Sequence, residues 1–263
     1  AMRPRAQAAR AVLVGQLLER ARILWPDQWL AFAPLPFRFA TWVGYDMDGR
    51  TDIGWHTSIA FRLQEKAERL ARYTAQLDRI DPAHPLLDTL RPAAAFAQSS
   101  AADFAADLTS GEAFAAAANR LTAGDPDNLL SLAPLIAALE SEARSAEPAR
   151  AVALRTLAAA MRADGLGMGW IHFRVNAKQL HNAIRRRLPE GEAIDLASKS
   201  ALATLRRMVD EARPLRTNFA ALATESSTAI RQFIAMAQIL RHIDAAAPIR
   251  MLVAECEQPA TML

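Results

Sequence analysis

The stretch Phe37-Arg-Phe-Ala-Thr-Trp-Val-Gly-Tyr45 is rich in aromatic and β-branched residues, and Asp46-Met-Asp-Gly49 follows it directly. Such residues favour a strand, and Asp-Gly is a common turn pair, so we expect a strand that runs into a turn. Two further apolar runs occur later, Trp170-Ile-His-Phe-Arg-Val175 and Ile249-Arg-Met-Leu-Val-Ala-Glu255. The three runs predict three short strands, around which the rest of the fold is built.

Helical periodicity fills the sequence between these runs. Apolar residues recur at helical spacing, and alanine, which favours helices, is abundant. Helices are expected over residues 5–22, 57–77, 94–104, 112–121, 128–144, 148–164, 176–188 and 194–223, the last bent or divided at Pro214. A loop is predicted at Pro82, Pro85 and Pro92, before the helix expected over residues 94–104. Residues 229–237 fit either a strand or the start of a helix.

Two local features of these helices can be predicted. In the helix over 57–77, Glu65, Lys66 and Arg69 are expected on the polar face, opposite an apolar stripe. Asp127 or Asn128 is expected to cap the helix that follows, because a short polar side chain can accept hydrogen bonds from the first backbone N–H groups of a helix.

Strands that alternate with long helical segments are typical of parallel strands joined by helical crossovers. We therefore expect an α/β fold that is predominantly helical, organised as a single domain over residues 1–263. Its expected parts are a helical lead-in over 1–36, a strand, loop and helix over 37–80, a helical insertion over 81–165, and strands with helices over 166–263.

Composition narrows the class of protein. The 263 residues are 52% hydrophobic, which excludes a disordered acidic or basic tail, and the formal net charge of +3 does not suggest a nucleic-acid partner. A single cysteine, Cys256, excludes an intramolecular disulfide framework and a cysteine-based zinc finger. The sequence lacks a run of about 18 apolar residues, so no membrane partner is expected either. These features predict a cytoplasmic protein.

Polar residues stand where the predicted strands end. Functional groups of parallel sheets gather at the carboxyl ends of the strands, and Asp46, Asp48, Arg174 and Glu255 lie there. Carboxylates suit a hard divalent cation, and an arginine can hold a carboxylate or phosphate. The pattern favours a metal-assisted reaction on an anionic substrate, and the alternative is an ordinary Asp-Gly turn. The sequence has no dinucleotide or phosphate-binding glycine motif, no nucleophile elbow and no histidine pair at zinc spacing.

The same stretches resemble phosphoenolpyruvate carboxylase. Residues 37–49 resemble the family segment R-F-T-S-W-M-G-G-D-R-D-G-N-P, and residues 166–174 are similar to its strand F-G-L-x-L-x-x-L-D-I-R-Q-E-S. Residues 233–237 resemble its I-S-M-A segment, and residues 251–256 its V-x-P-L-F-E-T strand. The four segments occur in the family's order, and together they cover most of this chain but about a third of a family member.

The resemblance implies a partial (β/α) barrel of an enzyme that joins phosphoenolpyruvate to bicarbonate, forming oxaloacetate and phosphate with Mg²⁺ or Mn²⁺. Glu255 then corresponds to the metal-binding glutamate, Trp42 to a tryptophan near the bicarbonate region, and Arg38 and Arg174 to arginines of the active face. Asp46 and Asp48 correspond to the two aspartates of the D-R-D-G loop, and with Arg174 they are the catalytic residues that the resemblance implies. Substrate binding is expected at Trp42, Arg38 and Arg50.

The sequence departs from the family at several of these positions. Met47 stands where the loop has its arginine, and Arg50 is placed to restore the lost charge from a shifted position. Residues 175–177 replace Q-E-S, and the His-Pro-Thr motif and the segments expected after Glu255, with the catalytic lysine and the second metal carboxylate, are absent.

We therefore expect a fragment or divergent relative of the carboxylase, inactive by itself. A half-barrel would expose a strand edge, so a homo-oligomer or the remainder of a longer chain is the expected partner. Two alternatives remain, a catalytically inactive binding or regulatory module and a purely helical scaffold.

Overall fold

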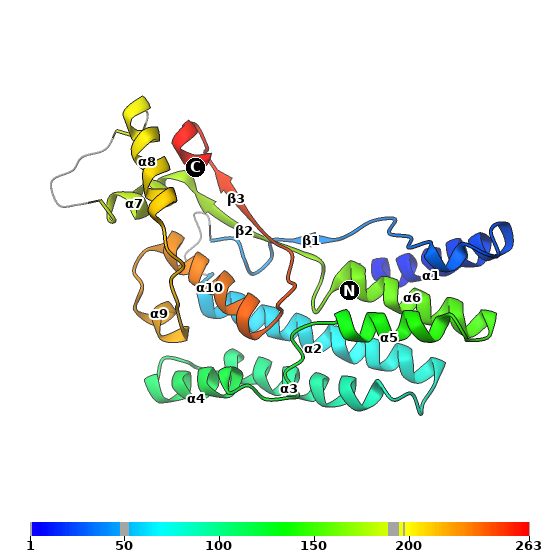
Figure 1. Ribbon diagram of the computed structural model, residues 1–263. Helices are drawn as coiled ribbons and strands as arrows, with labels where there is room; N and C mark the ends of the chain where they lie inside the picture. Colours follow the sequence, from blue (N-terminus) through cyan, green and yellow to red (C-terminus); the bar gives the residue numbers. More distant parts are fainter. Residues whose placement is uncertain (1, 48–52, 189–194, 197, 263) are drawn as a thin grey trace.

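The computed structural model describes residues 2–47, 53–188, 195–196 and 198–262 and has a predominantly helical α/β architecture (Figure 1). Three parallel strands form one sheet in the order β1-β2-β3: β1 at Ala40–Thr41, β2 at Trp170–Asn176 and β3 at Ile249–Ala254. Neighbours in the sheet are therefore also consecutive along the chain. This arrangement contradicts the purely helical alternative.

Helices make up most of the remaining described chain, and in Figure 1 they lie mainly below one face of the sheet. None of them, within the described residues, has the length and apolar character that a membrane span requires. The α-helices are α1 (Met2–Leu24), α2 (Trp55–Ile80), α3 (Leu87–Ala105), α4 (Gly111–Thr122), α5 (Ala133–Ala143), α6 (Pro148–Asp164), α7 (Ala177–Arg185), α8 (Lys199–Glu211), α9 (Phe219–Thr224) and α10 (Thr228–His242). Two short 3-10 helices are η1 (Trp29–Ala31) and η2 (Pro259–Met262).

Strand β2 shows how the sheet is seated on the helices. Ile171, Phe173 and Val175 are fully buried, whereas His172 and Arg174 between them are only partly covered. Alternating side chains point to opposite faces of a strand, so one face of the sheet packs on the helices and the other does not. Ile171 and Phe173 belong to a hydrophobic cluster that also includes residues of α2 and α10, whereas Val175 belongs to a smaller cluster with Ala183 and Ala229.

Two hydrophobic clusters form most of the core. One joins α1, α2, α3, α5 and α6, and the other fills the space between the sheet and helices α2, α3, α4, α9 and α10. Helix α2, with 26 residues, contributes to both and connects them. The helices of the expected insertion over 81–165 take part in both clusters as well, so they are packed into the same body as the strands.

The first strand is much shorter than the run that predicts it. Only Ala40–Thr41 pairs with β2, and the chain then turns, with Gly44 at φ +84° and the N–H of Tyr45 donating to the carbonyl of Trp42 at 2.9 Å. After the turn, Asp46 rejoins the edge of β2 through a single parallel bridge to Arg174. The positive φ of Gly44 is the local reason, because such a backbone conformation interrupts an extended strand.

Other differences lie in the helices. Pro92 lies inside α3, not in a loop, because Leu87 and Leu90 are buried in the core and hold the first turns in place. Helix α5 begins at Ala133, and Asn128 does not cap it. The predicted break at Pro214 is confirmed, since α8 ends at Glu211 and α9 begins at Phe219, and residues 229–237 lie within helix α10.

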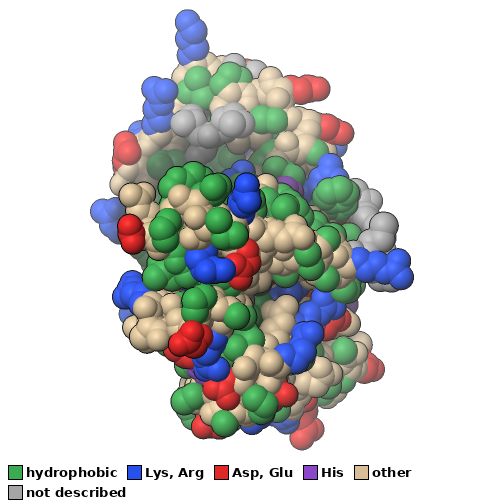
Figure 2. Space-filling view, turned by 90° about the vertical axis from the view of Figure 1, so that its right-hand side faces the viewer, with side chains coloured by type: hydrophobic (Ala, Val, Ile, Leu, Met, Phe, Trp, Pro, Cys, Tyr) green, Lys and Arg blue, Asp and Glu red, His purple; other side chains and the backbone are tan. Residues whose placement is uncertain are grey.

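One face of the molecule has a mixed surface chemistry. The face formed by the ends of α1, α5 and α6 carries interspersed basic and acidic side chains with apolar side chains between them (Figure 2). That mixture agrees with the small formal net charge of +3.

Gly169, just before β2, gives a testable constraint on this fold. Its φ is +103°, and a Cβ added there would lie 2.5 Å from the carbonyl oxygen of Phe39. Gly169→Ala is expected to lower the free energy of unfolding by about 2 kcal/mol, because an L side chain is strained at this φ and backbone must move. Urea denaturation would measure this effect. Gly111→Ala is the control, since nothing lies within 4 Å of its added Cβ, and equal stability of both variants would contradict the strain.

Candidate functional site at the carboxyl ends of the strands

The carboxyl ends of β1 and β2 meet at an ion pair between Asp46 and Arg174. Nη1 of Arg174 donates to Oδ2 of Asp46 at 3.0 Å, and the backbone N–H of Arg174 donates to the carbonyl of Tyr45 at 3.3 Å. Gln232 of α10 donates to the carbonyl of Arg174 at 2.8 Å. The structure thus brings together these two of the predicted catalytic residues, and it holds the backbone of Arg174 from two sides.

Glu255 follows β3 at the same edge of the sheet. Asn176, the last residue of β2, is paired with Ala254, so Glu255 comes directly after the paired part of its strand. Glu255 has a φ of +55°, which is uncommon for a residue other than glycine, and its side chain is exposed. The carboxyl edge, defined here by Asp46, Arg174, Asn176 and Glu255, therefore carries two carboxylates, a guanidinium and an amide.

A pocket of about 310 Å³ opens at this edge beside helix α7. It combines a carboxylate from the end of β3 with cationic or titratable groups of α7. Its lining residues are Asn176, Ala177, Lys178, His181, Arg185, Glu255, Glu257 and Gln258. We call it the α7 pocket.

Local hydrogen bonds fix the start of α7 at the pocket. The side chain of Asn176 accepts from the backbone N–H of Lys178 at 2.8 Å, and the side chain of Gln179 accepts from the backbone N–H of Asn176 at 3.1 Å. This reciprocal capping satisfies backbone groups at the helix N-terminus, where an anion is favoured. His181 shares a hydrogen bond of 2.8 Å with Thr261, and burial together with nearby Arg185 lowers the pKa of its imidazole.

The remaining predicted site residues lie elsewhere. Trp42 is 53% exposed in the turn that follows β1. Arg38 precedes β1 and lines a different pocket at the amino ends of the strands, together with Trp170 and Pro248. The structure therefore does not place Arg38 with the carboxyl edge. Asp48 and Arg50 lie outside the described residues.

Metal ligands can be assessed only in the described part of the chain. There, no group of three or more His, Cys, Asp or Glu side chains is arranged to hold a metal ion. Glu255, the residue predicted to bind Mg²⁺ or Mn²⁺, lies at the expected strand end. It belongs to no such group among the described residues. Its carboxylate could supply one oxygen ligand of a hard cation.

A buried charge cluster is the feature that sequence reasoning missed. The polar face predicted for α2 is wrong in its central turns, because Lys66 is 1% exposed and Arg69 8% exposed, and Arg62 is fully buried as well. The cluster consists of ionisable side chains from α1, α2, the end of α6 and the segment after α10. Its members are Arg10, Arg62, Glu65, Lys66, Arg69, Asp164 and Asp244.

Two aspartates neutralise most of the buried arginines. Arg62 forms an ion pair with Asp244, and Arg10 forms one with Asp164, which also lies 3.4 Å from Nη1 of Arg69. Although burial disfavours the charged guanidinium, Asp244 raises the pKa of Arg62 above its usual value. These pairs satisfy the requirement that buried charges be matched by partners.

Lys66 is held differently from the arginines. Its Nζ donates to Oδ1 of Asn128 at 2.7 Å and to the carbonyl of Ile243 at 2.9 Å. Burial lowers the pKa of its amine to about 7, against an opposing influence of Asp244. Asn128, predicted as a helix cap, is instead a partner of this lysine.

The comparisons with known proteins find no relative. No protein-family model, no curated protein and no solved structure matches the chain.

Proposed function

We propose that this chain is a fragment or divergent relative of a phosphoenolpyruvate carboxylase, and that its carboxyl edge binds phosphoenolpyruvate together with Mg²⁺ or Mn²⁺. The observation that carries the proposal is the meeting of Asp46 and Arg174 at adjacent strand ends, with Glu255 at the end of the third strand. Three parallel strands in chain order fit the beginning of a (β/α) barrel, whose active sites lie at this end.

The chemistry of the edge suits an anionic substrate with a metal. In the described part of the chain, the Arg174 guanidinium hydrogen-bonds to Asp46 alone, which leaves other N–H groups of its fork for a substrate carboxylate or phosphate. Lys178 and Arg185 add positive charge at the α7 pocket. A bound metal would stabilise the charge that develops on an enolate, and Glu255 would hold it.

A titration of the whole chain tests this proposal. Glu255→Gln is expected to weaken Mn²⁺ binding at least tenfold, and Arg174→Gln to weaken phosphoenolpyruvate binding at least tenfold, both followed by calorimetry. Glu147→Gln and Arg91→Gln are matched controls, because both residues are exposed and lie in other parts of the chain. If the wild-type chain binds neither phosphoenolpyruvate nor Mn²⁺, the proposal fails.

A second candidate function is a binding or regulatory module without turnover. Met47 favours it, because this residue stands where the family loop has arginine and is buried with 3% exposure. It therefore packs in the interior and supplies no charge to a substrate. Phosphoenolpyruvate binding without oxaloacetate formation from bicarbonate would favour the module, whereas oxaloacetate formation by the chain would exclude it.

A further inference from the structure

Exposed apolar side chains gather in one part of the molecule. Of the fifteen large apolar side chains that are exposed in the described part of the chain, ten lie between residues 12 and 43. Eight of these ten lie between residues 12 and 37, on α1 or on the segment that leads from α1 to β1. We call the surface formed by these eight side chains the α1 face.

The segment after α1 lies along the helix, which makes the α1 face continuous. Figure 1 shows the chain turning at the end of α1 and running back beside it toward β1. The guanidinium of Arg10, on α1, lies 5.8 Å from the ring centroid of Phe37, on the returning segment. On α1 itself, Val12 and Ile23 are exposed on the side away from Leu18, which is buried in the core. Solvent-facing positions of a surface helix are ordinarily polar, so this apolar face is a candidate for contact with a partner.

The area of the α1 face matches what one subunit contributes to a stable dimer. Its eight side chains are each about half exposed. At roughly 150–200 Å² for each large side chain, they present on the order of 700 Å² of apolar surface. The largest apolar patch of a typical monomer covers only about 300–600 Å². A specific protein–protein interface of standard size buries about 800 Å² on each partner.

Charged groups at the two ends of the α1 face complement each other. Arg5 and Asp27 are both exposed, neither has an ion pair in the described part of the chain, and they stand eleven positions on either side of Gln16. In two antiparallel α1 helices related by a twofold axis at Gln16, Arg5 of each copy would lie level with Asp27 of the other. Ala9 and Ile23 stand seven positions on either side of Gln16, so a small side chain would face a large one.

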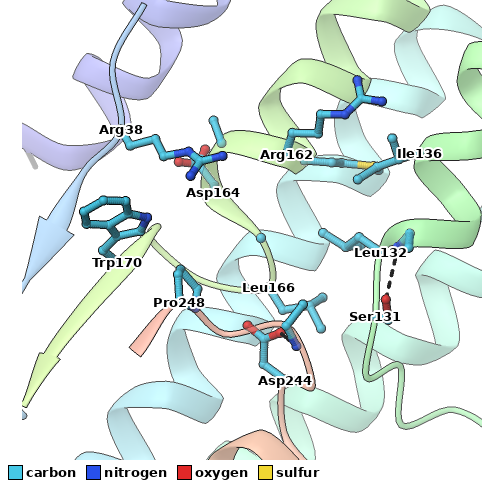
Figure 3. Close-up of a pocket in the computed structure, with 15 residues that line it drawn as sticks. Arg38, Ser131, Leu132, Ile136, Arg162, Asp164, Leu166, Trp170, Asp244 and Pro248 are labelled. Atoms are coloured by element: carbon cyan, nitrogen blue, oxygen red, sulfur yellow. Dashed lines mark hydrogen bonds between the residues drawn. The ribbon is translucent and has the colours of Figure 1, made fainter. Parts of the chain in front are cut away.

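Arg38 does not disturb this match. Besides Asp27, it is the only charged residue between positions 25 and 39. Figure 3 shows its side chain at the pocket at the amino ends of the strands, which it lines together with Asp164 and Trp170. Asp27 is therefore the charge that the segment brings to the α1 face.

We propose that the α1 face is the interface of a homodimer, in which the α1 helices of two copies pack antiparallel about a twofold axis at Gln16. Such an interface uses the same surface on both subunits, so it must be complementary to itself. The matched positions of Arg5 and Asp27 meet this requirement and favour a second copy over an unrelated partner. The dimer would bury the apolar side chains of both faces and form two ion pairs at its rim. The proposal does not depend on what the carboxyl edge binds.

The mass of the full chain in solution, followed by sedimentation velocity over a range of concentrations, tests the proposal. The wild type should have twice the mass of one chain. Val12→Glu should weaken dimerisation at least tenfold, because it places a carboxylate from each copy in the apolar interface. Val209→Glu is the matched control, since Val209 also lies in a helix and is 57% exposed, against 62% for Val12. Glutamate favours helices, so the circular dichroism of both variants should match that of the wild type.

A charge exchange tests the antiparallel arrangement. Arg5→Glu should weaken dimerisation several-fold, because the new carboxylate faces Asp27 of the other copy. Adding Asp27→Arg in the same chain should restore most of the affinity. A wild type that stays monomeric at every concentration, whether or not it binds lipid vesicles, would overturn the proposal. Equal effects of Val12→Glu and Val209→Glu, or no recovery in the double variant, would also overturn it.

Discussion

Asp244→Asn is expected to lower the free energy of unfolding by about 3–5 kcal/mol, as measured by urea denaturation. Asp244 is 2% exposed and forms an ion pair with Arg62, which is fully buried. The substitution keeps the shape of the side chain but removes its charge. Arg62 is then left with Glu65 as its nearest anion, at 3.3 Å. The large effect arises because the guanidinium cannot recover its hydration inside the protein.

An exposed ion pair provides the matched control. Arg91 and Asp78 form a bond of 2.8 Å with side chains 51% and 48% exposed. Asp78→Asn should therefore change the free energy of unfolding by less than about 1 kcal/mol, because water screens such pairs. A loss of less than 1 kcal/mol in Asp244→Asn would show that water reaches Arg62.

A double variant separates the lost attraction from the stranded charge. Arg62→Met in the Asp244→Asn background removes the unpaired guanidinium and replaces it with an apolar side chain. The double variant should be more stable than Asp244→Asn alone, even though it lacks both charges. The two residues are in contact, so their separate effects are not expected to add.

The strands could be predicted because their signal is local. Residues 170–175 and 249–255 are apolar runs with the composition of strands, and the structure has β2 at Trp170–Asn176 and β3 at Ile249–Ala254. Helix α6 has the bounds 148–164 that its periodicity predicts. The first strand could not be predicted to its full extent, because the turn at Gly44 depends on a backbone conformation that composition does not specify.

The buried charges could not be predicted, because their partners are remote in the sequence. Arg62 meets Asp244 across 182 positions, and Lys66 meets Asn128 across 62. Seen along α2 alone, these side chains have the spacing of a solvated face. The proximity of Asp46 and Arg174 could be predicted, because parallel strands place their carboxyl ends at one edge of the sheet whatever sequence lies between them.

The stability of the protein should rise between pH 7 and about pH 10, at up to ~1.4 kcal/mol per pH unit, because of Lys66. In the folded chain burial lowers the pKa of this amine to about 7, whereas in the unfolded chain it stays near the usual 10.5. Across that interval the unfolded state binds more protons than the folded state, so raising the pH favours folding. Denaturant unfolding at a series of pH values measures the slope.

Tyrosine and histidine side chains limit the pH interval over which this rise in stability is expected. Burial raises the pKa of Tyr45 and of Tyr73 in the folded chain, so above pH 10 the unfolded phenols ionise first and stability falls again. The pKa values of His181 and His242 are lowered, which places their titrations below the window. Asp244 opposes the loss of the Lys66 proton, so in Asp244→Asn the rise should begin at a lower pH.

Lys66→Met is the decisive variant, since it removes the titrating amine and keeps an unbranched side chain in its place. Its free energy of unfolding should vary far less with pH between 7 and 10 than that of the wild type, whatever its stability at pH 7. Lys178→Met removes an exposed lysine and should keep the wild-type slope. Parallel pH profiles for the wild type and Lys66→Met would mean that the amine stays protonated inside the fold. The hydrogen bonds to Asn128 and Ile243 would then be strong enough to offset its burial.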